Sequence, residues 1–144
     1  MTIRMVTTDD AADVCRICGD ELGYPSDKFL VMERIKQLNQ DKEAVFVAEQ
    51  GGVVVGFVHV EIYNTLYFEA SANILGLAVS SSCRNTGIGK ALLDRAEHWA
   101  MENDIELMRL SSSKRRADSH QFYVHQGYYP EKEQVKFVKR LPES

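Results

Sequence analysis

The sequence has few cysteines, and they point to neither a disulfide framework nor a metal site. Three cysteines occur in 144 residues, and an odd number does not suit a set of paired disulfides. Cys15 and Cys18 form a C-x-x-C pair, but they lie on an expected helix with no second Cys or His pair nearby. We therefore expect two half-buried thiols and no bound metal.

Long apolar runs and a surplus of basic residues are also missing. No apolar run reaches the roughly 18 to 20 residues of a membrane-spanning helix, and the first residues do not resemble a signal peptide. The formal net charge is −4, so nucleic acid has no electrostatic reason to bind and cationic partners are mildly favoured. We expect a cytoplasmic protein that binds neither membrane nor nucleic acid.

The sequence does contain a regular succession of strand and helix patterns. Apolar residues make up 44% and charged residues 26% of the chain, as in soluble globular proteins. Alternating or continuous apolar runs predict strands, and apolar residues at helical spacing predict helices. The expected elements are strand 2–6, helix 8–22, helix 27–38, strands 44–49, 53–63 and 73–80, helix 87–103, strand 105–111, helix 116–127 and a closing strand or hairpin over 128–141.

Turn and cap residues separate these elements. Gly51 and Gly52 predict a tight hairpin turn, Gly56 a bulge, Ser26 the cap of the second helix and Gly127 the end of the last helix. No linker or internal repeat interrupts the order β-α-α-β-β-β-α-β-α-β. We expect one mixed α/β domain over residues 1–144.

Residues 83–93, CRNTGIGKALL, place two glycines and a lysine where a helix is expected to begin. A helix start presents unpaired backbone N–H groups and the positive end of the helix dipole, so an anion suits it. Gly87 and Gly89 let phosphate oxygens approach, and Arg84 and Lys90 can supply positive charge. Taken alone, the stretch leaves a phosphate site and a ligand-free glycine turn equally open.

Two common phosphate motifs do not fit this stretch. A P-loop needs glycine where Arg84 stands and a hydroxyl where Ala91 stands. The dinucleotide motif G-x-G-x-x-G needs a third glycine where Leu92 stands. Neither a nucleoside triphosphatase nor a Rossmann dehydrogenase is therefore expected.

Arg84 to Gly89 do match [QR]-x-x-G-x-[GA], the acetyl-CoA loop of the GCN5-related N-acetyltransferases, and HQFYVHQGY at 120–128 resembles a later helix of that family. The resemblance covers nearly the whole chain. It implies the fold of that family, a mixed central sheet flanked by helices, with acetyl-CoA as the cofactor.

The resemblance also implies which residues hold acetyl-CoA. The loop amides would bind its pyrophosphate, and strand 73–80 would pair with its pantetheine arm, which requires the neighbouring strand 105–111 to diverge. Arg116 and Ser119, in a basic stretch, can bind the 3′-phosphate, or this stretch is only a solvated surface. The implied residues are Leu77, Ala78, Val79, Arg84, Asn85, Thr86, Gly87, Ile88, Gly89, Lys90, Arg116 and Ser119.

Tyr123 matches the tyrosine of the family's later helix and is the expected proton donor for the leaving thiolate. A phenol, with a reference pKa near 10, stays protonated at neutral pH and can donate to a thiolate whose thiol pKa is about 8.5. The alternative is that Phe122 and Tyr123 are core aromatic residues of this helix.

The general base stays open at the sequence level. Many relatives have a glutamate where this chain has Asn73 or Leu75, and neither residue takes a proton. A water chain that leads to a carboxylate is as plausible as any single side chain. The candidate side chains are Glu69, Glu61, His59 and His120, of which His120 has a suitable reference pKa near 6.5.

The acceptor is expected to bind between the turn at 20–29 and the loop at 63–70, because loops carry variable contacts over a rigid scaffold. Glu21, Tyr24 and Glu69 suit a cationic amine, although Tyr24 can also simply close its turn. The resemblance thus implies direct acetyl transfer, in a ternary complex, to a primary amine of a small acceptor.

Three other functions stay open. They are a non-catalytic acyl-CoA-binding module, which would lack a base, a peptide or protein N-acetyltransferase, and a protein-interaction domain, which would not bind coenzyme A. A homodimer is also possible, formed by pairing of the closing strand across a two-fold axis.

Overall fold

A five-stranded sheet forms the larger of two compact units. The computed structural model describes residues 1–112 and 117–143, and its contacts group into Met1–Ser111 and Ser112–Ser144. The strands are β1 (Thr2–Met5), β2 (Glu43–Gln50), β3 (Val53–Tyr63), β4 (Ser71–Val79) and β5 (Met108–Leu110), adjacent in that order. Each neighbouring pair from β1 to β4 is antiparallel, and β5 is parallel to β4. The mixed sheet expected from the sequence is therefore confirmed.

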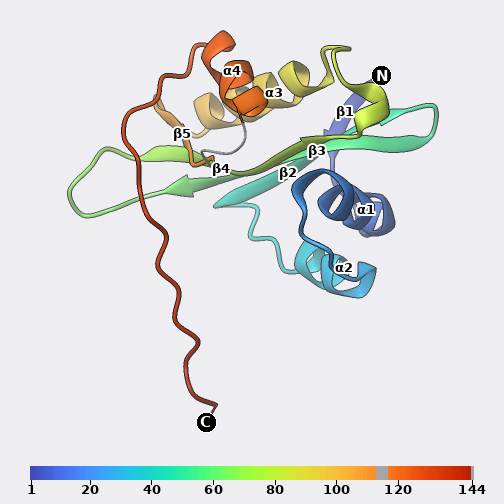
Figure 1. Cartoon of the computed structure of the whole chain (residues 1–144), viewed down its shortest axis with the longest axis horizontal. Coiled ribbons are helices and arrows are strands. Elements are labelled where there is room, and N and C mark those ends of the chain that lie inside the picture. Colours follow the sequence, from blue (N-terminus) through green and yellow to red (C-terminus); the bar gives the residue numbers. More distant parts are fainter. Residues whose placement is uncertain (113–116, 144) are drawn as a thin grey trace. The chain divides into compact units, whose positions relative to one another are not determined.

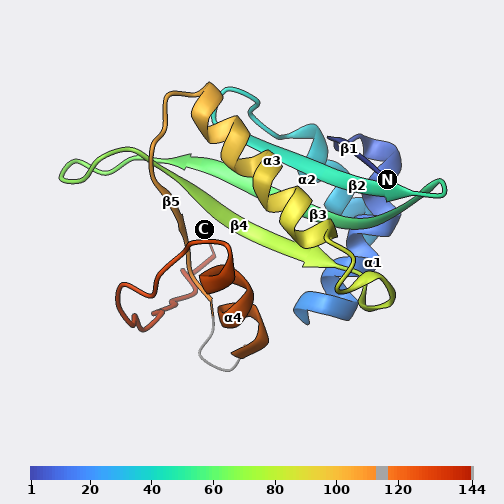
Figure 2. The same ribbon diagram turned by 90° about the horizontal axis from the view of Figure 1, so that it is seen from above.

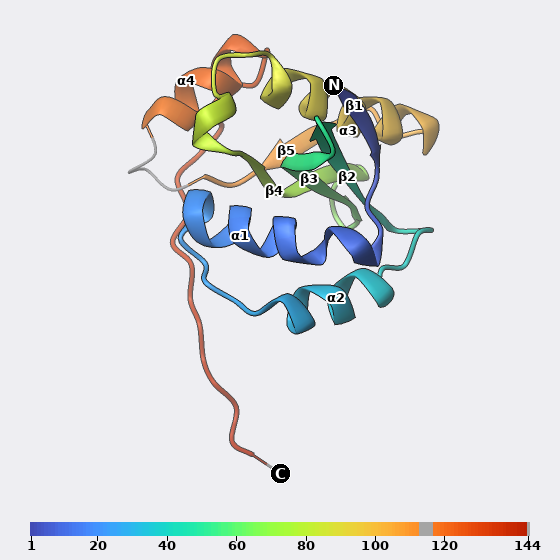
Figure 3. The same ribbon diagram turned by 90° about the vertical axis from the view of Figure 1, so that its right-hand side faces the viewer.

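Helices cover both faces of this sheet. Figures 1 and 3 show α1 (Ala11–Leu22) and α2 (Lys28–Lys36) under one face and α3 (Ile88–Glu102) over the other. A short 3-10 turn, η1 (Thr8–Asp10), precedes α1. The cap of α2 is Asp27 and not the expected Ser26, because the Asp27 carboxylate accepts hydrogen bonds from the N–H groups of Phe29 and Leu30.

The two layers of helices explain why the central strands are apolar without alternation. Residues 44–48 of β2 are all buried, since their side chains point in turn toward α1 and α3 and meet helices on both sides. Val45 and Val47 pack with Val14 and Ile17 of α1. On the other face the Arg95 guanidinium of α3 lies 4.2 Å from the centre of the Phe46 ring.

A bulge in β4 disturbs the middle of the sheet. His59 of β3 is opposite Gly76, but Val60 is opposite Ile74, so Leu75 is an extra residue in β4. Leu75 is 51% exposed. A bulge bends its strand and interrupts regular pairing, and β5 pairs with β4 only at residues 72–74.

The smaller unit contains α4 (Ala117–His125), where the sequence predicted a short helix. Gly127 follows it with a φ of 95°, as expected of a residue that ends a helix. The expected closing strand over 128–141 is wrong for this structure, because residues 128–143 have no helix or strand. Val135 and Phe137 are 77% and 91% exposed. The strand preference of such residues depends on a paired and packed neighbour, which this segment does not have in the described chain.

The Arg4–Asp10 ion pair is expected to make stability depend on pH. Both carboxylate oxygens of Asp10 accept from Arg4 at 2.8 Å, and Oδ2 also accepts from the Thr7 N–H. These bonds lower the pKa of Asp10. The stabilisation is then complete above the unfolded pKa near 3.9 and is lost as the pH falls through the lower folded value.

We expect Asp10→Asn to lose about 1–3 kcal/mol of unfolding free energy at pH 7, and less than that at pH 3. Urea unfolding at both pH values measures the difference. Asp9→Asn changes an exposed neighbour and is the matched control. An equal loss at the two pH values would contradict the role of the ion pair.

Gly56 is expected to tolerate no side chain. A Cβ built at this position would lie 3.0 Å from the Ala78 carbonyl oxygen and 3.0 Å from Leu92 Cδ1. We expect Gly56→Ala to destabilise the protein by about 1–3 kcal/mol through overpacking. The control is Gly19→Ala in α1, where the nearest atom is 3.9 Å away and the helix should gain about 0.5–1 kcal/mol. Thermal unfolding of both variants tests this contrast.

Candidate functional site

The turn before α3 presents backbone N–H groups with no side-chain cap. Asn85 and Gly87 have left-handed φ values of 63° and 84°, and Gly87 is the N-cap of α3 without a side-chain hydrogen bond. The first helical bond at this end runs from the Ala91 N–H to the Gly87 carbonyl at 3.0 Å. The N–H groups of the first helical turn are therefore available to an anion.

Both cations of this turn already form ion pairs. Arg84 Nη2 lies 2.8 Å from Glu21 Oε1, and Lys90 Nζ lies 2.7 Å from Asp94 Oδ2. The Asp94 carboxylate raises the pKa of Lys90, so the ammonium stays charged. The Lys90–Asp94 pair is exposed to solvent and therefore weak, so a phosphate group can compete for Lys90. In the other pair the Glu21 side chain is only 10% exposed and the Arg84 side chain 60%.

The Glu21 side chain of α1 contacts the turn before α3. Its carboxylate binds Arg84 and accepts a second hydrogen bond from the Ser81 N–H at 3.0 Å. The sequence suggested a contact between Glu21 and the acceptor, but the structure uses this carboxylate to hold the end of β4 and the start of the turn together. A second hydrogen bond orders the turn, from the Thr86 hydroxyl to the Cys83 carbonyl.

The second half of β4 has an open edge. Leu77, Ala78 and Val79 pair with β3 on one side. On the other side β5 stops opposite Ile74, so within the described residues no strand pairs with 75–79. Pairing with β5 therefore ends before residues 75–79, which include the segment expected to pair with a pantetheine arm. Figure 2 shows the end of β4 leading through η2 (Ser81–Cys83) into the start of α3, so the open edge and the uncapped turn are continuous.

Polar side chains from β2, β3, β4 and β5 form two hydrogen-bonded groups near the bulge. In the first, His59 Nε2 lies 2.8 Å from Glu43 Oε1. In the second, the Asn73 amide donates to Glu61 at 2.8 Å and accepts from Arg109 at 3.0 Å. Asn73 thus holds a glutamate on the neighbouring strand and is itself held by Arg109.

His59 and Glu61 were candidates from the sequence, but two of their neighbours were not. Glu43 lies on β2, which the turn at 51–52 joins to β3, and Arg109 lies on β5, far from β3 in sequence. The strand register brings both to this region. Arg109 also lies 4.3 Å from the centre of the Tyr63 ring. Alternation along β3 places positions 59 and 61 on one face, but no comparable signal identifies their partners.

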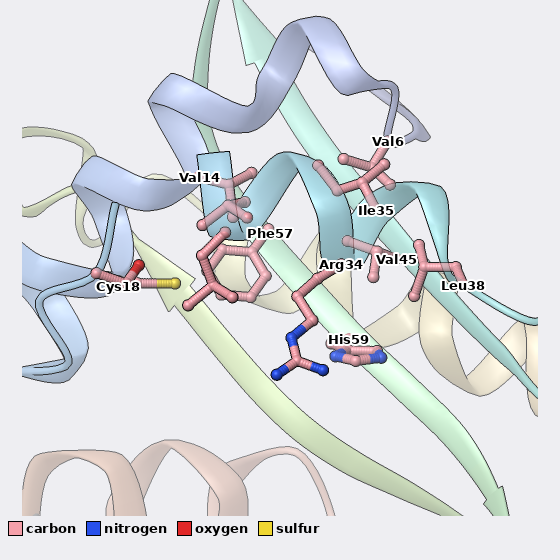
Figure 4. A pocket seen from close by; sticks show the side chains of 12 residues that line it. Val6, Val14, Cys18, Arg34, Ile35, Leu38, Val45, Phe57 and His59 are labelled. Atoms are coloured by element: carbon pink, nitrogen blue, oxygen red, sulfur yellow. The ribbon is translucent and has the colours of Figure 1, made fainter. Parts of the chain in front are cut away.

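A pocket of about 260 Å³ lies between the sheet and the helices α1 and α2. Figure 4 shows Arg34 and His59 among apolar side chains that include Val45 and Phe57. Cys18 also lines the pocket, and burial raises the pKa of its thiol, so this group stays protonated. Cys15, Cys18 and Cys83 are free thiols, each partly buried, as expected for the first two.

The remaining predicted residues are divided between the two units. Tyr24 and Glu69 are exposed, on the turn between α1 and α2 and on the loop before β4. Ser119, His120 and Tyr123 lie on α4 in the smaller unit, where the Tyr123 ring contacts Phe122 and Tyr128 edge to face. Arg116 lies outside the described residues.

Neither a metal cluster nor a membrane helix is found in residues 1–112 and 117–143. No group of three or more metal-binding side chains is present there. No helix in the same ranges is long and apolar enough to cross a bilayer.

Comparisons with known proteins agree with this geometry. The model of a family described as the acetyltransferase (GNAT) family matches residues 12–128. An aminoalkylphosphonate N-acetyltransferase of Salmonella typhimurium is 29% identical, over 96% of this chain and 90% of that protein. A structure named as a transcriptional regulator from Bacillus halodurans C-125 is 27% identical with a TM-score of 0.81, over 96% and 99% of the two chains.

A further solved structure is similar in fold alone. It is the aminoglycoside N-acetyltransferase AAC(6')-Iy in complex with the bisubstrate analog CoA-S-monomethyl-acetylneamine. Its TM-score is 0.80 at 22% identity, over 97% of this chain and 98% of that chain.

Proposed function

Because this chain belongs to the acetyltransferase (GNAT) family, we propose that it transfers the acetyl group of acetyl-CoA directly to a primary amine of a small acceptor in a ternary complex. One observation carries the proposal: an open strand edge at residues 75–79 is followed, after the short turn η2, by an uncapped helix start. Acetyl-CoA, when bound, supplies the acetyl group as an activated thioester.

The chain can hold each part of acetyl-CoA with its backbone. Leu77, Ala78 and Val79 offer N–H and C=O groups along the open edge of β4, which suits the amides of a pantetheine arm. The N–H groups of residues 87–90 suit a pyrophosphate. Gly87 adopts a left-handed conformation with no atom within 4 Å of its Cβ position, so the turn is also unobstructed there.

We assign the proton acceptor to His59, with Glu43 as its positioning residue. In the tautomer that donates Nε2–H to Glu43, Nδ1 is left to take a proton. His59 lines the pocket and is opposite Gly76 at the start of the open edge. Glu61 is the second choice, because the Asn73 amide already donates to its carboxylate. Glu69 and His120 stay predictions without a described contact that supports them.

Tyr123 is the proposed proton donor, through its hydroxyl group. The proposal depends on the family resemblance of the α4 sequence and on the acidity of a phenol relative to a thiol. The role of Ser119, and of Arg116 in the same stretch, as ligands of the 3′-phosphate remains a proposal of the same kind.

A small amine is the acceptor that the relatives support best. One relative is named for aminoalkylphosphonates, and a structure of similar fold is named for aminoglycosides. The acidic net charge of −4 also favours an ammonium group in the encounter. Tyr24 and Glu69, on exposed segments beside the sheet, remain candidates for contact with the acceptor.

Two measurements on the intact chain test this function. Calorimetry should show binding of acetyl-CoA, and a thiol reagent should report free coenzyme A when amino acids, aminoalkylphosphonates, polyamines or aminoglycosides are added. Gly87→Val places a branched side chain at a φ of 84° and should weaken binding at least tenfold without unfolding the protein. Absence of acetyl-CoA binding to the unsubstituted chain would overturn the proposal.

A further inference from the structure

The pocket under α2 is larger than helix packing requires. Helix α2 buries none of its residues fully, although Val31 and Ile35 face the pocket from its apolar side. Well-packed interiors leave few voids larger than a water molecule. A volume of about 260 Å³ lies just below the range of ordinary small-molecule sites, which begins near 300 Å³.

The pocket is apolar apart from a small polar group. Arg34 and His59 are the charged or titratable side chains in its lining other than the Cys18 thiol. The Arg34 side chain has no ion pair within the described chain, whereas Lys36 on the same helix pairs with Glu33. A guanidinium with no carboxylate partner suits an anionic group of a ligand, which it can bind through two parallel hydrogen bonds.

This polar group lies close to the open edge of β4. His59 is directly opposite Gly76, and Phe57, which also lines the pocket, is opposite Ala78. Adjacent strands lie about 4.8 Å apart, so a molecule that contacts His59 is roughly one strand spacing from the edge. Gly76 has no side chain in the way, and the nearest atom to its Cβ position is in the Phe57 ring, at 3.5 Å.

We propose that this pocket selects the acceptor, and that the acceptor is a primary amine with an adjacent carboxylate or phosphonate and a small aliphatic side chain. The side chain would fill the apolar pocket, the anionic group would bind Arg34, and the amine would lie against His59 at the strand edge. This inference rests on the proposed acetyltransferase function and adds the class of acceptor to it.

Matched amines separate the contributions of the acceptor's three groups, which are the amine, the anionic group and the aliphatic side chain. Norvaline has all three, 1-aminobutylphosphonate replaces the carboxylate, n-butylamine lacks the anionic group and glycine lacks the side chain. We expect KM for norvaline or for 1-aminobutylphosphonate to be at least tenfold below KM for n-butylamine and for glycine. Whichever of norvaline and 1-aminobutylphosphonate has the lower KM shows whether the preferred anionic group is a carboxylate or a phosphonate. Arg34→Met should raise KM at least tenfold for the two anionic substrates with side chains and leave n-butylamine unchanged. Lys36→Met is the control and should change neither.

Binding without turnover provides an independent reading. Norvaline, added to the protein with coenzyme A, should shift the amide NMR signals of Val45 and Phe57, and Arg34→Met should abolish the shifts. Shifts without thiol release for any amine would overturn the proposed function while supporting the pocket as the site. Equal KM values for norvaline and n-butylamine, or an equal effect of Arg34→Met on both, would overturn the inference, as would unshifted signals at saturating norvaline.

Discussion

Acetyl transfer by the Tyr123→Phe variant is expected to be slower by roughly 10²- to 10⁴-fold in kcat, the usual contribution of general acid catalysis. The substitution removes the hydroxyl and keeps the ring, which contacts Phe122 and Tyr128. Affinity for acetyl-CoA should therefore stay within about twofold in calorimetry. Steady-state release of free thiol, at saturating acetyl-CoA and amine, gives kcat.

Tyr129→Phe is the matched control for this prediction. Tyr129 is exposed and lies in the same unit, so its substitution should leave kcat and acetyl-CoA affinity unchanged. Full kcat in Tyr123→Phe would show that the leaving thiolate takes its proton elsewhere. Loss of acetyl-CoA affinity in parallel with kcat would assign Tyr123 to binding rather than to proton transfer.

The second large effect is expected at His59. Glutamine at this position can still donate a hydrogen bond to Glu43 but cannot take a proton from the ammonium group of the acceptor. We expect kcat/KM to fall by roughly 10²- to 10³-fold at pH 7. The deficit should shrink as the pH approaches the reference pKa of an alkyl amine, near 10, because the neutral amine then forms without help.

A pH–rate profile of His59→Gln against the unsubstituted enzyme measures this convergence. Glu43→Gln should give a smaller loss, of roughly tenfold, because it removes the charge that orients the imidazole but leaves the imidazole in place. His98→Gln is the control, since His98 is an exposed histidine on α3. A deficit that stays constant up to high pH would count against proton transfer and favour a contact with the acceptor.

The ion pairs at the helix turn change what is expected of its basic residues. From sequence, Arg84 and Lys90 are free cations beside a phosphate, but in the structure each has a carboxylate partner within 3 Å. The backbone N–H groups are thus the part of the turn that is ready to bind an anion. Arg84 and Lys90 contribute to phosphate binding only after each leaves its carboxylate partner for the phosphate.

The sequence by itself determined the features of this protein that depend on short stretches of the chain. The spacing of apolar residues predicts the helices and all five strands of the sheet, and the glycines before Ile88 predict the turn at the start of α3. These features depend on residues close in the chain, such as a cap, a turn glycine or an apolar stripe. The N-cap of α2 was predicted one residue too early, at Ser26. Asp27, the next residue, is also a good cap and takes that position in the structure.

Features that join distant residues were decided by the tertiary structure. Register alone places Glu43 beside His59 and Arg109 beside Asn73, and the packing of α2 against the sheet puts Arg34 in the pocket. The closing strand was predicted from its own residues, but a strand exists only where another strand pairs with it. Local sequence carries dihedral preferences and apolar periodicity, whereas pairing, ion partners and cavities depend on which remote segments meet.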